Sequence, residues 1–220
     1  GGLAAGAVLS IAASLQQLAL SFTSAGKTGF ITSLYTIFVP IISFLFLKKK
    51  VRSHVWIGAI LAVSGLFLIS FDGKFVIAVE DIVLVMAAIF YALQIFVIDH
   101  FIKYSSGMVL SAAQLFSGAV ISLLLSFIFE KDSNLNRILN LNAVILIICA
   151  GVISIGVAQT LQIIAQKKAA PSVASIIFSF ESVFGAIFGA IILKESMTSS
   201  QILGCILIFI AVITSQYEKS

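Results

Sequence analysis

Long apolar runs, almost free of charge, fill most of this 220-residue sequence and decide what it can fold into. About 20 apolar residues in a helix are enough to cross the hydrocarbon core of a bilayer. The runs are about twice the length of a membrane β-strand and lack its alternation, so only helices fit them. We expect eight spans: Gly2–Leu20, Thr28–Leu47, His54–Phe71, Asp81–Asp99, Met108–Phe129, Ala143–Ala165, Pro171–Leu193 and Ser199–Gln216.

The composition supports a membrane location. Hydrophobic residues make up 60% of the chain and charged residues 10%, and the mean hydropathy is +1.19. A soluble domain of this length could not bury so much apolar surface. Cys149 and Cys205 lie inside apolar runs, where we expect free, buried thiols rather than a disulfide or a metal site. The sequence therefore predicts an all-α polytopic membrane protein with no metal, cofactor or nucleic-acid partner.

Basic residues are concentrated in alternate connections between the expected spans. Three of these connections carry most of the positive charge: Lys48–Arg52, His100–Lys103 and Lys167–Lys168. Cytoplasmic connections of membrane proteins carry an excess of Lys and Arg. We therefore expect these three connections and the C-terminus to be cytoplasmic in a multi-pass protein of the cell membrane. Lys27 is the one basic residue that this orientation leaves on the wrong side.

An internal repeat relates residues that are about 146 positions apart. The matched pairs include Gln16 and Gln162, Ser33 and Ser179, Tyr35 and Glu181, Lys48 and Lys194, and Gly58 and Gly204. The first span then matches the sixth, and a shift by an odd number of spans reverses direction across the membrane. Inverted repeats of this kind are common in secondary transporters, which bind substrate near the midplane. We expect residues 1–72 to be three helices of a first repeat and residues 80–216 a second repeat of five helices.

Several short motifs resemble the EamA-like family of the drug/metabolite transporter (DMT) superfamily. Thr23–Tyr35, continuing to Pro40, is similar to the third-to-fourth helix segment of that family. The stretches similar to its ninth and tenth helices are Ala170–Ser175, Phe180–Phe184, Leu193–Glu195 and Gln201–Gly204. The family usually has Pro where this chain has Ser182. The resemblance implies a ten-helix bundle of inverted repeats around a central cavity, of which this chain lacks the first two helices, and transport of small metabolites, often export.

Glu181 is the strongest candidate for a functional residue. It lies near the middle of an apolar run, where a carboxylate costs a few kcal/mol unless it faces the protein interior or a wet cavity. We expect it to bind a proton or the amine of a substrate, and the alternative is a structural hydrogen bond to a neighbouring helix. Tyr35, its repeat mate, is expected at a related depth across the cavity, as a hydroxyl ligand or as a packing aromatic.

Other polar residues share helix faces within the spans. Tyr91 and Gln94 lie three residues apart, Gln114 belongs to a stripe of polar and small residues, and Gln159 and Gln162 repeat the pattern. Such groups either line a cavity or form interhelical hydrogen bonds worth roughly 1 kcal/mol. The candidate substrate-binding residues are Glu181, Tyr35, Tyr91, Gln94, Gln114, Gln159, Gln162, Ser33 and Ser179.

Two further patterns give structural expectations. Gly185 and Gly189 form a small-residue face, which predicts close helix packing. Asp99 and Lys103 are expected to form a charge pair near the membrane surface.

These observations predict a secondary transporter, an exporter of small metabolites such as amino acids or related compounds, that works by alternating access around a midplane cavity. Its partners are the substrate, the lipid bilayer and protons, and a homodimer is left open. The sequence contains no H-E-x-x-H, G-x-S-x-G or P-loop motif, so we do not expect an enzyme. The alternatives are an inactive truncated fragment and a channel-like pore.

Overall fold

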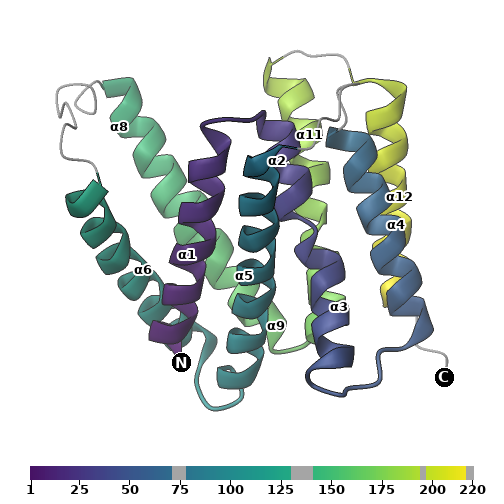
Figure 1. Cartoon of the computed structure of the whole chain (residues 1–220), viewed down its shortest axis with the longest axis horizontal. Coiled ribbons are helices and arrows are strands. Elements are labelled where there is room, and N and C mark those ends of the chain that lie inside the picture. Colours follow the sequence, from purple (N-terminus) through teal and green to yellow (C-terminus); the bar gives the residue numbers. More distant parts are fainter. Residues whose placement is uncertain (71–77, 130–140, 194–196, 217–220) are drawn as a thin grey trace. The chain divides into compact units, whose positions relative to one another are not determined.

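The structure is a computed structural model that describes residues 1–70, 78–129, 141–193 and 197–216. Every regular element in these residues is helical (Figure 1). The elements are α1 (Gly2–Leu20), α2 (Ala25–Thr32), α3 (Tyr35–Leu45), α4 (Ser53–Ser70), α5 (Val79–Phe101), α6 (Gly107–Phe129), α8 (Leu141–Ile148), the π-helix η1 (Cys149–Ala158), α9 (Gln159–Gln166), α10 (Pro171–Phe178), α11 (Phe180–Leu193) and α12 (Ser199–Ser215).

The helices confirm the predicted fold class. Within the described residues, six helical spans are long and apolar enough to cross a membrane: Gly2–Leu20, Ala25–Leu45, Ser53–Ser70, Val79–Phe101, Gly107–Ile128 and Pro171–Ile191. Two shorter apolar helices, Gly151–Gln166 and Ser199–Ser215, fall on the remaining expected spans. The chain is therefore an all-α, multi-pass membrane protein.

The chain divides into two compact units. The first unit contains Gly1–Ser10 and Phe96–Ala169, and the second contains Ile11–Ile95 and Ala170–Ser220. In the first unit, Ala5, Ile98, Leu110 and Ile163 form a buried apolar cluster that joins α1, α5, α6 and α9. The Ser117 hydroxyl group donates a hydrogen bond to the carbonyl oxygen of Leu3 at 3.1 Å, which fixes the start of α1 on α6.

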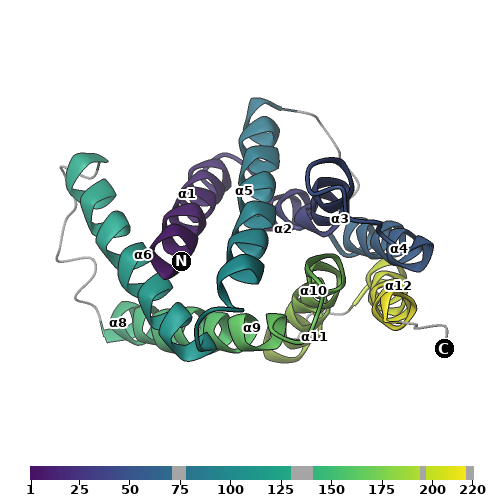
Figure 2. The same cartoon turned by 90° about the horizontal axis from the view of Figure 1, so that it is seen from below.

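In the second unit, α4 and α12 lie side by side (Figures 1 and 2). A Cβ atom added to Gly65 would lie 2.6 Å from the carbonyl oxygen of Gly204, and a Cβ atom on Gly204 would lie 2.6 Å from that of Gly65. A Cβ atom on Gly58 would lie 3.0 Å from the carbonyl oxygen of Ala211. The predicted repeat pairs Gly58 with Gly204 and Gly65 with Ala211. It therefore converts the contact of Gly65 with Gly204 into the contact of Ala211 with Gly58. This reciprocity supports the inverted repeat, whose bounds stay a prediction.

Two of the expected spans are interrupted near their centres. The first interruption, at Ser33 and Leu34, separates α2 from α3, and the second, at Ser179, separates α10 from α11. The ψ angles are −6° at Ser33, −11° at Leu34 and −16° at Ser179, whereas a regular α-helix has about −42°. The chain tightens here into bonds between residues three apart, such as Leu34 N–H to Ile31 C=O at 3.2 Å. Each span therefore consists of two half-helices.

Local residues explain where several helices begin. The Ser24 hydroxyl group accepts a hydrogen bond from the backbone N–H of Lys27 and caps α2. Pro171 occupies the first turn of α10, where its missing N–H group costs nothing. Thr198 and Gln201 form a capping box at the start of α12, in which each side chain accepts a hydrogen bond from the other residue's backbone N–H group.

Two predictions about packing were wrong and one is confirmed. A Cβ atom at Gly185 or Gly189 would meet no atom of the described chain within 4 Å, so these glycines mark no close contact there. The reason is that α11 packs through Val183, on the side that meets Leu66 and Ile208. Cys149 is free, as expected, but exposed rather than buried. The predicted pair between Lys103 Nζ and Asp99 Oδ2 is present at 3.6 Å.

Candidate functional site

Four polar side chains from four helices gather in the second unit: Gln16 of α1, Tyr35 of α3, Tyr91 of α5 and Glu181 of α11. The Tyr91 hydroxyl group donates a hydrogen bond to Gln16 Oε1 at 2.5 Å. The ring centroids of Tyr35 and Tyr91 are 6.4 Å apart, with 56° between the ring planes. Glu181 lies in the same unit, and it is the charged residue near both tyrosines. We call these four side chains the polar cluster.

The helix interruptions place two members of the polar cluster. Tyr35 is the first residue of α3, and Glu181 lies in the first turn of α11. The positive end of a helix dipole favours a carboxylate in this position. Tyr35 comes two residues after Ser33, and Glu181 comes two residues after its repeat mate Ser179. The tight turns therefore set the direction in which both side chains leave the backbone.

Hydrogen bonds between α3 and α10 hold the half-helices in place. The Thr36 hydroxyl group donates to the carbonyl oxygen of Ser175, and the Ser175 hydroxyl group donates to that of Thr36, each at 3.4 Å. The hydroxyl groups of Ser43 and Ser172 lie 3.2 Å apart. All four residues are buried. Satisfied polar contacts of this kind stabilise the packing of helices where no water is present.

The members of the polar cluster differ in burial. Glu181 is exposed, whereas Gln16, Tyr35 and Tyr91 are half-buried. A carboxylate beside two aromatic rings can bind a cation, because the carboxylate supplies a counter-charge and the ring faces attract positive charge. The same carboxylate can take up and release a proton. The polar cluster thus has the chemistry of a site for an amine or a proton.

The remaining candidates in the second unit occupy different environments. Gln94 is buried, with 2% of its surface exposed. Ser179 is also buried, and its hydroxyl group donates to the carbonyl oxygen of Ile176 at 2.6 Å within its own helix. Ser33 is half-buried at the end of α2. The Ser179 hydroxyl group therefore serves the helix interruption.

In the first unit, α6 and α9 are joined by polar contacts. Gln114 Nε2 donates a hydrogen bond to Gln159 Oε1 at 3.3 Å, and the hydroxyl groups of Ser111 and Thr160 lie 2.6 Å apart. Gln162 is half-buried on α9. Gln114 and Gln159 therefore form an interhelical hydrogen bond, which was one of the two roles that the sequence left open for them.

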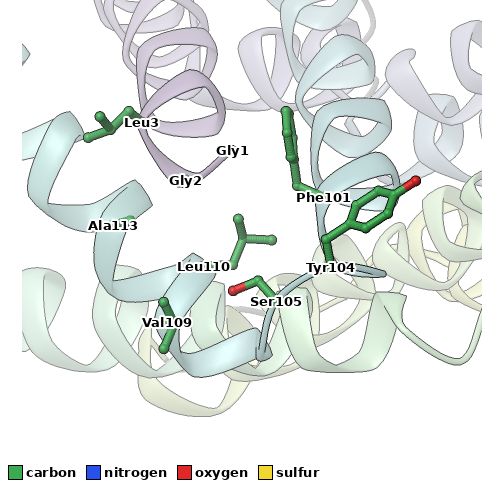
Figure 3. A pocket seen from close by; sticks show the side chains of 9 residues that line it. All are labelled: Gly1, Gly2, Leu3, Phe101, Tyr104, Ser105, Val109, Leu110 and Ala113. Atoms are coloured by element: carbon green, nitrogen blue, oxygen red, sulfur yellow. The ribbon is translucent and has the colours of Figure 1, made fainter.

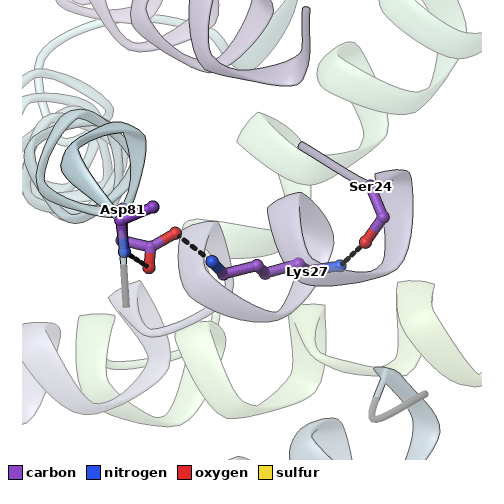
Figure 4. Close-up of polar contacts among 4 residues, drawn as sticks. Ser24, Lys27 and Asp81 are labelled. Atoms are coloured by element: carbon purple, nitrogen blue, oxygen red, sulfur yellow. Dashed lines mark hydrogen bonds and ion pairs between the residues drawn. The ribbon is translucent and has the colours of Figure 1, made fainter. Parts of the chain in front are cut away.

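Sequence reasoning missed the ion pair between Lys27 and Asp81 (Figure 4). Lys27 Nζ lies 2.7 Å from Asp81 Oδ1, and the two side chains are only 15% and 10% exposed. Asp81 Oδ2 also accepts a hydrogen bond from the backbone N–H of Ala78 at 2.8 Å. Two features of the sequence could have indicated this pair: Lys27 is a basic residue on the wrong side of the predicted orientation, and Asp81 is an acidic residue at the start of a span. Gln16 was noted only as the repeat mate of Gln162.

The first unit also contains a pocket of about 360 Å³ (Figure 3). The start of α1, the end of α5 and the start of α6 line it, with Leu3, Phe101 and Leu110 as its main apolar side chains. Tyr104 and Ser105 supply its side-chain hydroxyl groups. The side chains that line it include no carboxylate or ammonium group.

Apolar spans, paired interruptions and a polar cluster beside them define a polytopic membrane protein with a polar site built on broken helices. The chain belongs to the EamA-like transporter family, which matches residues 2–71 and 79–216. It is 31% identical over 198 residues to an uncharacterized transporter of Archaeoglobus fulgidus. That match covers 90% of this chain and 62% of the relative, so the chain spans less than two thirds of the relative's length.

The fold is also similar to a solved crystal structure. The TM-score is 0.76 at 13% sequence identity, and the match covers 98% of this chain and 86% of the other. Such a low identity shows a shared fold and says nothing about a shared substrate.

Proposed function

We propose that the protein is a secondary transporter of small, amine-bearing metabolites such as amino acids or related compounds, and that it exports them. Membership of the EamA-like transporter family supports transport. The observation that carries the proposed substrate site is Glu181 itself, an exposed acidic residue within a membrane-spanning segment and in the same unit as Tyr35 and Tyr91. Family membership also favours transport over catalysis.

In the proposed mechanism, Glu181 is occupied alternately by a proton and by the ammonium group of the substrate. Either occupant neutralises the carboxylate, so the site can change its side of the membrane without carrying an uncompensated charge. A gradient drives net transport only if the inward-facing and outward-facing states differ in affinity. The further candidates remain proposals within each unit: Gln94, Ser33 and Ser179 in the second unit with Glu181, and Gln114, Gln159 and Gln162 in the first.

We place the protein in the cell membrane as a multi-pass protein with a cytoplasmic C-terminus. The basic connection Lys48–Arg52 supports this orientation through the positive-inside rule. The C-terminal residues 217–220 lie outside the described part of the chain. A homodimer is compatible with the many exposed apolar side chains, which also fit contact with lipid.

Glu181→Gln in the full-length protein tests this function. The substitution keeps size and hydrogen bonding but removes titration. Uptake of a panel of radiolabelled amino acids and monoamines is measured in liposomes, with and without a pH gradient. We expect the variant to lose gradient-driven uptake and to show weaker substrate exchange, because the neutral amide also removes the counter-charge of the substrate ammonium group. Glu80→Gln, the same change in the first turn of α5, is the matched control and should transport normally.

Gradient-driven uptake that is unchanged in Glu181→Gln would contradict the proposed coupling role. Flux without saturation and without counterflow would identify a channel-like pore instead, because a channel opens to both sides at once. Absence of flux for every compound in the panel, with the protein folded, would contradict the proposed substrate class.

A further inference from the structure

The half-helices next to the two interruptions pack in the same way on both sides of the repeat. Phe30 of α2 and Val183 of α11 pack in one apolar cluster with Leu66 of α4. The repeat mates of these residues also share one apolar cluster: Ile176 of α10, Ile37 of α3 and Val212 of α12. Near the interruptions, the contact of α2 with α11 is therefore equivalent to the contact of α10 with α3.

Further from the interruptions, α3 and α10 stay in contact through buried hydroxyl groups. Thr36 and Ser175 each donate a hydrogen bond to the other's carbonyl oxygen at 3.4 Å. The hydroxyl groups of Ser43 and Ser172 lie 3.2 Å apart. Separating the two helices would break these buried hydrogen bonds, so α3 and α10 form a closed contact.

The equivalent outer contact between α2 and α11 is open. The repeat mates of Thr36, Ser175, Ser43 and Ser172 are, in this order, Ser182, Gly29, Gly189 and Gly26. A Cβ atom added to Gly29 or Gly189 would meet no other atom of the described residues within 4 Å. A Cβ atom on Gly26 would meet only Ser70 of α4, at 3.3 Å. The structure is thus symmetric near the interruptions and asymmetric beyond them.

The residues of the open contact allow it to close. Gly26, Gly29 and Gly189 have no side chain, so the backbones of α2 and α11 can approach each other closely. The Ser182 hydroxyl group can donate to the carbonyl oxygen of Gly29, as the hydroxyl group of its mate Thr36 does to that of Ser175.

We propose that α2 and α11 are a closing pair. In a second state of the protein, Gly29 meets Ser182 and Gly26 meets Gly189, while the hydroxyl contacts between α3 and α10 separate. The inference rests on the proposed function, because it assumes alternation between two states, and it names the residues that close each end. The end that is closed in this structure is the one next to the connection Lys48–Arg52, which the proposed orientation places in the cytoplasm.

Disulfide formation tests the second state without a substrate. Two cysteine pairs are introduced into the full-length protein after its native cysteines are replaced by Ala: Ser43→Cys with Ser172→Cys, and Gly26→Cys with Gly189→Cys. A disulfide requires Cβ atoms about 3.5–4.5 Å apart. Each pair is oxidised in liposomes, and the disulfide is measured by mass spectrometry of peptides. We expect both to form, the first from the state described here and the second from the proposed state.

A variant with all four cysteines tests whether the two contacts exclude each other. After oxidation and alkylation, its intact mass should show one disulfide and two alkylated thiols in each molecule.

Gly26→Cys with Ile191→Cys is the control pair. Ile191 is 67% exposed, and its repeat mate Leu45 is 60% exposed although α3 is closed onto α10. Ile191 should therefore face away from α2 in both states, and this pair should form no disulfide.

A larger side chain at Gly29 should block the second state alone. Gly29→Leu should leave the thermal unfolding midpoint and the Ser43–Ser172 disulfide unchanged. It should lower the yield of the Gly26–Gly189 disulfide by about tenfold or more, because overpacking destabilises a close contact. Gly151→Leu, at a helical glycine of the first unit that also has no neighbour within 4 Å, should change neither disulfide. If Gly29→Leu does not fold, Gly29→Val replaces it.

The outcomes separate this inference from the proposed function. If the Gly26–Gly189 disulfide does not form while the unmodified protein transports amines, the closing pair is refuted and the proposed function stands. Molecules that carry both disulfides, or an unchanged Gly26–Gly189 yield in the folded Gly29 variant, would also refute the closing pair. If the disulfides exclude each other but no compound of the panel is transported, the closing pair stands and the proposed substrate class fails.

Discussion

The ion pair between Lys27 and Asp81 joins the half-helix α2 to the first turn of α5. Tyr91 lies further along α5. The contact between the two side chains is short and largely buried. Removing one partner of a buried ion pair leaves an uncompensated charge and typically costs about 3–5 kcal/mol. Replacing both with apolar groups costs much less, since no charge is then left without a partner.

We therefore expect Lys27→Met and Asp81→Leu each to lower the thermal unfolding midpoint strongly, and the double variant to be more stable than either single variant. Unfolding of the purified protein in detergent measures this. Asp99→Asn is the control: it breaks an ion pair whose lysine side chain is 59% exposed, and it should cost no more than about 1 kcal/mol. Additive losses in the double variant would contradict a direct pairing of Lys27 with Asp81.

At the scale of single residues, the sequence was informative where a charged group lies inside an apolar span, because its high free-energy cost there indicates a function. Glu181 stood out as a carboxylate in an apolar run, and the repeat pointed to Tyr35, which lies in the same unit. The bond between Gln16 and Tyr91 could not be predicted, because the repeat relates residues by symmetry and says nothing about which helix faces meet. The Lys27–Asp81 pair was missed for the same reason.

In the second unit, α4 and α12 pack closely against each other, and their glycines explain why. At Gly65 an added Cβ atom would meet the backbone of α12, which cannot move aside as a flexible side chain can. The sequence predicted the spans because length and apolarity are written directly into each run. It did not predict the interruptions at Ser33 and Ser179, where no Gly or Pro stands and where tertiary contacts decide the turn.

Gly65→Ala should therefore destabilise the protein by about 1–3 kcal/mol, the usual cost of overpacking a core. Gly185→Ala is the matched control: the same atom is added to another helix, with no neighbour within 4 Å. Since Ala is the better helix former, Gly185→Ala should be neutral or stabilising by up to about 1 kcal/mol. Thermal unfolding of both variants in detergent measures the difference, and equal stability of the two would contradict the close contact between α4 and α12.

Over the whole molecule, the fold class could be predicted because composition and run length determine it, and the family could be predicted because short motifs such as Ala170–Ser175 resemble it. The arrangement of helix faces could not, because apolar residues cover nearly every face and a lipid-facing leucine looks like a packed one. Gly185 and Gly189 illustrate this limit, since a small-residue face predicted packing that the described chain does not have. The charge of the connections is easier to interpret than helix faces, because charged connections must lie at a membrane surface and so predict the orientation of the chain.

The orientation of the whole molecule gives the last prediction. The connection Lys48–Arg52 should be cytoplasmic, and the exposed turn at Ser21, one span earlier, should face the opposite side. Single cysteines are introduced as Lys49→Cys and Ser21→Cys after Cys149 and Cys205 are replaced by Ala. An impermeant thiol reagent added to intact cells should label the Ser21→Cys variant only, and cell lysis should allow labelling of the Lys49→Cys variant. Labelling of Lys49→Cys but not Ser21→Cys before lysis would reverse the orientation, and with it the direction assigned to transport.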